Sequence, residues 1–204
     1  MTTHGDKTEL RKRLRARRRA LSEAERFRRS HAVCERLRRR SEFQRARRIA
    51  LYLPNDGEVD PTPLLDAIWG SRRLALLPVL RVLAGNRLAF HPYRPGDVLA
   101  PNRYGIPEPV AHPGEAVPAH ALDLVLMPLV AFDAQGHRLG MGGGFYDRTF
   151  AFLRQRRHWH RPQLVGVAYD FQEVPELPAE PWDVPLHAVV TESRWIPCPG
   201  ETPP

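Results

Sequence analysis

The hydrophobic positions of the chain change period along its length, and this change predicts the elements. Leu10, Leu14 and Leu21 recur at roughly helical spacing through a strongly basic run. The following "SEAE" at residues 22–25 fits a capping box that starts a second helix. We therefore expect an N-terminal basic helical hairpin over about the first forty residues, with arginine-rich outer faces.

The second helix is expected to bury an apolar face formed by Phe27, Cys34 and Leu37. The chain has two cysteines, Cys34 and Cys198, without CxxC spacing or the pattern of a disulfide framework. We interpret both as structural or incidental, and the chain as a reduced, cytoplasmic protein. No apolar run approaches the roughly 20 residues that a membrane-spanning helix needs, so we expect no membrane partner.

Apolar runs of strand length follow, separated by turn signals and helical segments. Strands are expected at residues 48–54, 73–80, 88–93, 122–133, 163–171 and 187–192. Helices are expected at residues 60–70 and from the glycine-rich segment to about Arg157, whereas residues 92–120, rich in proline and glycine, predict long loops.

This alternation of strands and helices predicts an α/β fold. We expect a mainly parallel sheet flanked by helices, in a three-layer, Rossmann-like α/β/α arrangement. The length of 204 residues favours one domain, which we place at residues 1–196, with a disordered tail at 197–204. We expect a monomer.

Charge changes this picture because the net +8 is unevenly spread. Residues 7–48 carry 18 Lys or Arg against 5 Asp or Glu, a balance of +13 that leaves −5 for the remainder. Such a segment favours anionic partners, including nucleic acid and phosphate-bearing small molecules. A dedicated nucleic-acid function is the weaker hypothesis, because the segment matches no recognised nucleic-acid module and has few interleaved aromatics.

Candidate chemistry is concentrated in the stretch "GHRLGMGGGFYDRTFAFL", residues 136–153. It holds five glycines after the strongest predicted strand and before a helix, the position where α/β proteins bind phosphate through bare backbone N–H groups. The dinucleotide fingerprint fails because Phe145 stands where a glycine is required, and the Walker sequence is absent. From the residues alone, a phosphate loop and a packing turn stay equally open. Asp147 by itself is more typical of a helix-dipole partner than of a metal ligand.

Several segments together resemble the 5-formyltetrahydrofolate cyclo-ligase family, also called 5,10-methenyltetrahydrofolate synthetases. The matching stretches are "KTELRKRLRARRRALSEAER", "ALYLPNDGEVDPTPLL", "LVLMPLVAFDAQGHRLGMGGGFYDRTF", "LVGVAYDFQ" and "PWDVPLHAVVTE". The resemblance implies an ATP- and Mg²⁺-dependent enzyme that converts 5-formyltetrahydrofolate, and its polyglutamates, into 5,10-methenyltetrahydrofolate, ADP and phosphate. A non-catalytic folate or nucleotide binder stays an alternative, since fold does not guarantee turnover.

The resemblance also implies site residues. ATP is expected against Lys7, Thr8, Glu9, Leu10, Arg11, Arg138, Leu139, Gly140, Met141, Gly142, Gly143, Gly144, Phe145 and Tyr146. Folate is expected against Leu53, Glu58, Met141, Gly142, Gly143, Gly144 and Phe145. The metal carboxylates are expected to be Asp147 and Asp183, and the catalytic residues Arg138, Tyr146 and Asp147.

This sequence departs from the common pattern of the family at four positions. Trp182 and His187 stand where members often have His and Asp, so we do not expect His187 to bind metal. Phe145 replaces a frequent tyrosine, and Gly143 a lysine of some relatives. The phosphate charge would then be neutralised mainly by Arg138, Lys7 and Arg11.

Overall fold

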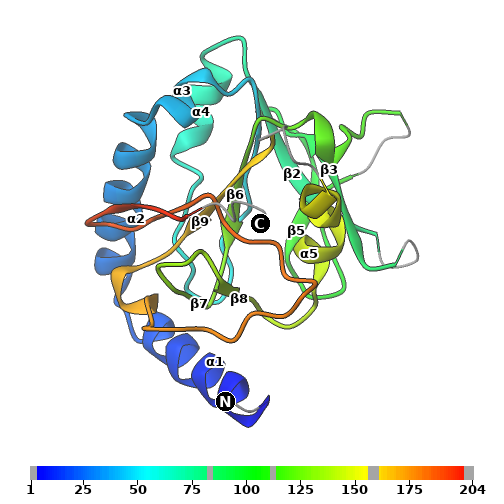
Figure 1. Ribbon diagram of the computed structural model, residues 1–204. Helices are drawn as coiled ribbons and strands as arrows, with labels where there is room; N and C mark the ends of the chain where they lie inside the picture. Colours follow the sequence, from blue (N-terminus) through cyan, green and yellow to red (C-terminus); the bar gives the residue numbers. More distant parts are fainter. Residues whose placement is uncertain (1–3, 82–84, 111–113, 156–160, 200–204) are drawn as a thin grey trace.

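The computed structural model describes residues 4–81, 85–110, 114–155 and 161–199. A seven-stranded sheet forms its centre, in the order β11-β10-β9-β6-β1-β2-β3 (Figure 1). The strands are β1 (Arg48–Ala50), β2 (Leu74–Arg81), β3 (Arg87–Pro92), β6 (Leu124–Pro128), β9 (Gln163–Val167), β10 (Ala188–Val190) and β11 (Trp195–Pro197). The five inner strands are parallel, and β3 and β11 pair antiparallel at the two edges. The predicted α/β class with a mainly parallel sheet is confirmed.

Helices cover both faces of this sheet. The helices α2 (Glu23–Arg38), α3 (Ser41–Arg45) and α4 (Leu64–Trp69) lie on one face, and α5 (Phe145–Phe150) lies on the other (Figure 1). Successive strand residues point to opposite faces, so that Ile49 joins the core beneath α2 and α4 whereas Ala50 joins the core on the side of α5. Both faces of the central strands are buried, as in other parallel sheets.

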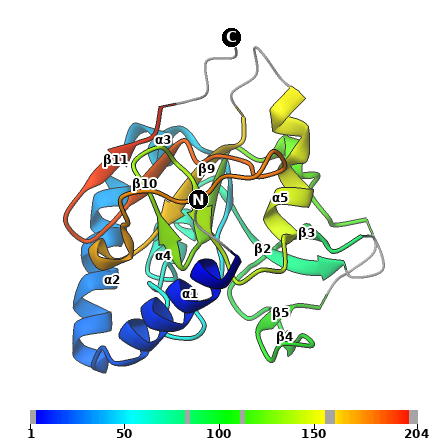
Figure 2. The same cartoon turned by 60° about the horizontal axis from the view of Figure 1, so that its bottom comes forward.

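The N-terminal segment forms two helices, as predicted. They are α1 (His4–Arg19) and α2, and Ser22 caps α2 through the predicted capping box with Glu25. The two helices diverge from their turn instead of lying side by side (Figures 1 and 2). The predicted apolar face of α2 is wrong at Phe27, whose exposed fraction is 71%. The helix instead buries Ser30 together with Val33, Cys34 and Leu37.

Several predicted boundaries differ from the structure. The strand expected at residues 122–133 divides after Pro128 into β6 and β7 (Ala131–Phe132), and β7 pairs with β8 (Arg138–Leu139). The loop expected at 92–120 contains a hairpin of β4 (Leu99–Pro101) and β5 (Pro107–Pro109), and Glu108 of this hairpin accepts a hydrogen bond from the Leu80 amide. Short 3₁₀ segments lie at Ala119–Ala121, Ala151–Gln155 and Asp170–Gln172.

The two ends of the prediction also need correction. The helix expected to reach Arg157 ends as an α-helix at Phe150, and residues 156–160 lie outside the described part of the chain. Pro197, expected in a disordered tail, ends β11, and Cys198 after it is buried, with its amide bonded to the His187 carbonyl. Residues 200–204 lie outside the described residues.

No helix within the described residues is long and apolar enough to cross a bilayer.

Candidate active site

The parallel strands take the doubly wound order β2-β1-β6-β9-β10. From β1 the chain adds β2 on one side, and it then adds β6, β9 and β10 on the other, so the order of strand addition reverses between β1 and β6. Ligands of such folds bind at the carboxyl ends of the two strands that flank this reversal. The turn at residues 55–58 follows β1, and the glycine loop at residues 140–144 follows β6 through the β7–β8 hairpin. The topology therefore brings the two segments expected to bind folate and ATP to one edge of the sheet.

The glycine loop leaves its backbone open at Gly140 and Gly142, whereas Phe145 covers Gly143 and Arg148 covers Gly144. Gly142 and Gly144 have φ angles of 95° and 61°, a conformation that favours glycine. A Cβ built on Gly140 would meet nothing within 4 Å, and one built on Gly142 would meet only an Arg11 nitrogen, at 3.9 Å. Residues 141–143 are exposed. An anion can thus approach these amides with an arginine already beside them, which fits a phosphate group.

Helix α1 lies along the same edge and contributes its first cations there (Figure 2). The Arg11 Nε donates a hydrogen bond of 2.8 Å to the Gly140 carbonyl, so α1 is attached directly to the glycine loop. The Lys7 Nζ lies 3.3 Å from the Glu180 carboxylate, with 15% of its side chain exposed. Thr8 and Glu9 are exposed on the same turn, and Leu10 is half-buried against the core around Leu14.

Asp147 is held in place by two neighbours. Arg138, at the start of β8, forms an ion pair of 2.5 Å with the Asp147 Oδ1 and also donates to the Val184 carbonyl. The same oxygen accepts a hydrogen bond of 3.3 Å from the Val184 amide. Only 7% of the Arg138 side chain is exposed. The structure therefore places Arg138 against Asp147, whereas the sequence assigned it to phosphate.

The second expected metal carboxylate belongs to the residue just before Val184, whose amide contacts Asp147. Asp183 precedes Val184 and accepts a hydrogen bond of 3.0 Å from the Glu180 amide. Among the described residues, no group of three His, Cys, Asp or Glu could hold a metal ion. Two carboxylates fit Mg²⁺, which usually takes one or two of them and completes its octahedral shell with phosphate oxygens and water. The Nδ1 of His187 is used elsewhere, because it accepts a hydrogen bond from the Leu164 amide.

The turn after β1 is fastened to the last turns of α1. Asp56, with a φ of 52°, accepts hydrogen bonds from the guanidinium groups of Arg15, Arg18 and Arg19. Burial alone would raise the pKa of Asp56, but these three hydrogen bonds lower it to about 2. Gly57 follows with a φ of 74°, and a Cβ there would lie 3.0 Å from the Arg18 carbonyl oxygen. The turn and the helix are therefore in close backbone contact.

Arg18 is fully buried, contrary to the expected arginine-rich outer face of this helix. Its Nη2 lies 2.9 Å from Asp56, its Nη1 lies 3.6 Å from Glu58 and donates to the Leu129 carbonyl, and its Nε has no partner within the described structure. A guanidinium taken out of water requires such acceptors, because an unpaired buried charge is strongly unfavourable. Arg18 thereby connects α1 to the turn after β1 and to the end of β6.

Glu58 lies in a pocket of tyrosines, with 13% of its side chain exposed. Burial raises the pKa of Glu58 to about 7, although Arg18 and the Asn55 amide oppose this shift. The Tyr169 hydroxyl donates to the Glu58 carbonyl at 3.3 Å. Burial, and then the charge of Glu58, raise the pKa values of Tyr52 and Tyr146. The carboxyl group of Glu58 thus titrates near neutrality beside aromatic rings.

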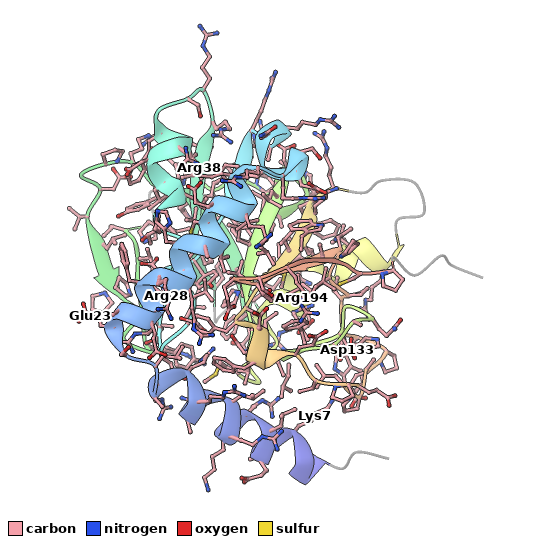
Figure 3. All side chains as sticks on the ribbon, turned by 90° about the vertical axis from the view of Figure 1, so that its left-hand side faces the viewer. Lys7, Glu23, Arg28, Arg38, Asp133 and Arg194 are labelled. Atoms are coloured by element: carbon pink, nitrogen blue, oxygen red, sulfur yellow. The ribbon has the colours of Figure 1, made fainter. Side chains whose placement is uncertain are left out.

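Apolar side chains complete this edge. Leu53 is half-buried against the core, and Met141 is 54% exposed at the glycine loop. Phe145 contacts Tyr104 edge to face, with ring centroids 6.4 Å apart. Tyr146 stacks on Phe150 instead of facing solvent. Figure 3 shows Lys7 on α1 at this end of the molecule and Arg38 at the far end of α2.

Fold and site together define an α/β enzyme whose expected binding segments meet at the carboxyl edge of a parallel sheet. The profile of the 5-formyltetrahydrofolate cyclo-ligase family matches residues 3–192. The chain belongs to the 5-formyltetrahydrofolate cyclo-ligase family.

Individual relatives agree with this assignment. The 5-formyltetrahydrofolate cyclo-ligase of Escherichia coli K12 is 41% identical over 181 residues, which cover 89% of this chain and 97% of that protein. The enzyme of the same name from Haemophilus influenzae is 40% identical over 151 residues, 73% of this chain and 78% of that protein. The solved structure of Aquifex aeolicus 5,10-methenyltetrahydrofolate synthetase has a TM-score of 0.79 and 37% identity, and covers 95% of this chain and 93% of that one.

The residues that fix the turn at residues 55–58, here called the folate-side turn because folate is expected there, were not found from the sequence. Arg18 stands within "RRR", where no residue is distinguished from its neighbours, and Tyr52 and Tyr169 look like ordinary strand residues. The only available signal was "NDGE", which predicts a turn but does not reveal which helix its aspartate contacts.

We predict that Asp56→Asn lowers the free energy of unfolding by about 3 kcal/mol, because it leaves the buried Arg18 with a weakened partner. Stability of the wild type should also decline as the pH falls from about 4 through 2, since the folded pKa of Asp56 lies below its ordinary value. Urea unfolding followed by circular dichroism measures both effects. Arg19→Ala is the control, because 56% of that side chain is exposed; a loss below about 1 kcal/mol is expected for it. Equal losses in the two variants would contradict the assigned role of Arg18.

Proposed function

We propose that the protein catalyses the ATP- and Mg²⁺-dependent conversion of 5-formyltetrahydrofolate into 5,10-methenyltetrahydrofolate, with release of ADP and phosphate. The observation that carries this proposal is the course of α1. One helix contacts the glycine loop through Arg11 and the turn of Glu58 through Arg18, so the expected ATP and folate segments adjoin each other across a single rigid element.

The chemistry requires positioning and charge neutralisation more than a protein nucleophile. The formyl oxygen attacks the γ-phosphorus of ATP while the bond from that phosphorus to the bridging oxygen of ADP breaks. N10 of the folate then attacks the formyl carbon, the carbon–oxygen bond to phosphate breaks, and N10 loses its proton to solvent. Phosphorylation thereby turns a poor leaving group into phosphate.

Each group at the edge has a task in this sequence of steps. Lys7, Arg11 and the bare amides of the glycine loop hold the triphosphate. Asp147, oriented by Arg138, and Asp183 would hold Mg²⁺, which supplies neutralisation of phosphate charge when bound. Glu58 accepts hydrogen bonds from ring N–H groups of the pterin, and Tyr146 forms part of the wall beside it.

The contacts of α1 also bear on the alternative of a nucleic-acid protein. Lys7, Arg11, Arg15 and Arg18 are engaged by ion pairs or hydrogen bonds within the molecule. They are therefore poorly placed to follow an external phosphate backbone, which supports the enzyme over that alternative. The monomeric state, the cytoplasmic location and the use of polyglutamates stay predictions.

The direct experiment mixes the purified protein with 5-formyltetrahydrofolate, ATP and Mg²⁺ and follows the absorbance of the methenyl product. Product is expected only with all three present, and reactions without ATP or with a chelator serve as controls. Binding of folate without turnover would instead identify a non-catalytic binder.

We predict that Asp147→Asn lowers turnover on the order of a hundredfold or more, because it weakens the metal carboxylate pair while keeping side-chain volume and a hydrogen-bond acceptor for Val184. Asp123→Asn, at the opposite edge of the sheet, is the matched control and should retain turnover. Steady-state rates at several Mg²⁺ concentrations measure the effect. A stable Asp147→Asn protein with the wild-type rate and Mg²⁺ dependence would remove Asp147 from the mechanism.

We predict that combining Lys7→Ala with Arg11→Ala raises the KM for ATP about tenfold or more, since two cations beside the triphosphate are lost. The KM for 5-formyltetrahydrofolate should change much less. Lys12 and Arg13 are exposed on the same helix, so alanine at those two positions provides the control of equal charge. An unchanged ATP requirement in the Lys7 and Arg11 variant would contradict their assignment.

We predict that kcat/KM for 5-formyltetrahydrofolate falls as the pH decreases below about 7, because protonated Glu58 can no longer accept both hydrogen bonds from the pterin. The raised pKa sets the direction: the carboxyl group is ionised above that value and neutral below it. The decline should approach tenfold per pH unit. Glu58→Gln should reduce kcat/KM and remove this limb of the profile; the same limb in that variant would assign the titration to another group.

A further inference from the structure

A second hollow lies at the opposite edge of the sheet from the active site. It has a volume of about 740 Å³ and lies between the end of α2, α3 and the connection from α4 to β2. Figure 1 shows α3 and α4 at this upper edge, and α1 at the lower one. Five arginines from three stretches of the chain line it: Arg38, Arg45 and Arg47, and Arg72 and Arg73.

The charge of this hollow is not neutralised by its own lining, which contains no Asp or Glu. Arg38 forms an ion pair of 3.1 Å with Glu35. The guanidinium groups of Arg45, Arg47 and Arg72 form no ion pair with any residue that the structure describes. These three residues are exposed and line one cavity from α3, from the residues before β1 and from the residues before β2.

Two carboxylates beside this lining are already engaged. Glu42 of α3 is paired with Arg40 through two hydrogen bonds. Asp123 accepts hydrogen bonds from the amides of Arg47 and Arg48 and from the Arg161 guanidinium. Asp66 of α4 is exposed and does not line the hollow, so an external anion is the counter-charge that can enter it.

Arg73 gives the hollow a fixed wall. Its guanidinium donates to the carbonyls of Phe43 and Ala67 and to the Ser71 hydroxyl, and it lies 4.8 Å from the centroid of the Phe43 ring. With its donors used in this way, Arg73 holds α3, α4 and β2 together. The backbone segments that carry the other arginines are thereby held in fixed relative positions.

We propose that this arginine hollow is a second anion-binding site, for a small molecule that carries two or more adjacent phosphate groups. Each guanidinium group can donate two hydrogen bonds to a pair of phosphate oxygens. Three guanidinium groups therefore suit a ligand with neighbouring phosphates better than a ligand with a single carboxylate. A volume of this size lies within the range of small-molecule sites. The site is separate from the proposed ATP site, because it lies before β1 and β2 and not after β1 and β6.

Titration calorimetry with inorganic tripolyphosphate, in buffer of physiological ionic strength without divalent cations, tests the proposal. Combining Arg45→Ala, Arg47→Ala and Arg72→Ala should weaken binding at this site at least about tenfold. The control removes the same charge from the β2–β3 side, where Arg81, Arg87 and Arg94 are exposed. Turnover should be unchanged in both triple variants.

The variant with alanine at Lys7 and Arg11 separates this site from the active site. The wild type should bind two equivalents of tripolyphosphate, the Lys7 and Arg11 variant should keep the one at the arginine hollow, and the Arg45, Arg47 and Arg72 variant should lose it. The loss in the Arg45, Arg47 and Arg72 variant does not depend on whether an anion binds at the glycine loop; only the second equivalent in the wild type does. No difference in stoichiometry or affinity between the two triple variants would overturn the proposal.

Two further ligands identify the source of the phosphates. Binding of a nucleoside triphosphate to the Lys7 and Arg11 variant, tighter than that of tripolyphosphate, would assign the hollow to nucleotides; weaker binding would assign it to inorganic chains. If a twelve-nucleotide oligothymidylate bound to the hollow and neither tripolyphosphate nor the nucleoside triphosphate did, the proposal would be overturned in favour of a nucleic-acid surface.

Discussion

The buried guanidinium of Arg18 constrains the arrangement of the active site. A permanently charged group without exposure is tolerated only where acceptors surround it, and here they come from Asp56, Glu58 and the Leu129 carbonyl. These acceptors belong to the segments that follow β1 and β6. Because one side chain requires all three, the helix α1, the folate-side turn and the end of β6 cannot move apart without exposing an uncompensated charge.

The two tasks of α1 follow from the rise of a helix. Arg11 and Arg18 are separated by seven residues, or about two turns and roughly 10 Å along the axis, and therefore lie on the same face. That spacing lets one helix contact the glycine loop with one arginine and the Glu58 turn with the other. A basic N-terminal segment, whose sequence also suggests nucleic-acid binding, thus joins the two proposed binding segments, which are more than eighty residues apart in the chain.

The sequence was sufficient for features with a local signal. The capping box of Ser22, the strands at β2 and β6 and the glycine loop each carry a pattern that a few neighbouring residues determine. Pro78 does not end β2, because it lies beyond the residues that pair with β1. The contacts of Arg18 and Arg138 could not be predicted, since their partners lie far along the chain and only the tertiary fold selects one arginine from many. The resemblance supplied Asp147 and Asp183, but not the ion pair with Arg138 that orients the first of them.

The doubly wound topology also explains why the two edges of the sheet differ in their chemistry. Helices that connect parallel strands run opposite to them, so the carboxyl edge receives helix beginnings and loop amides, whereas the amino edge receives helix ends with their carbonyls. Glycine and bare backbone can therefore serve an anion at the carboxyl edge. At the amino edge the backbone offers acceptors, which Arg73 already uses at Phe43 and Ala67. An anion held there must be held by side chains, and arginine supplies the donors that the backbone lacks.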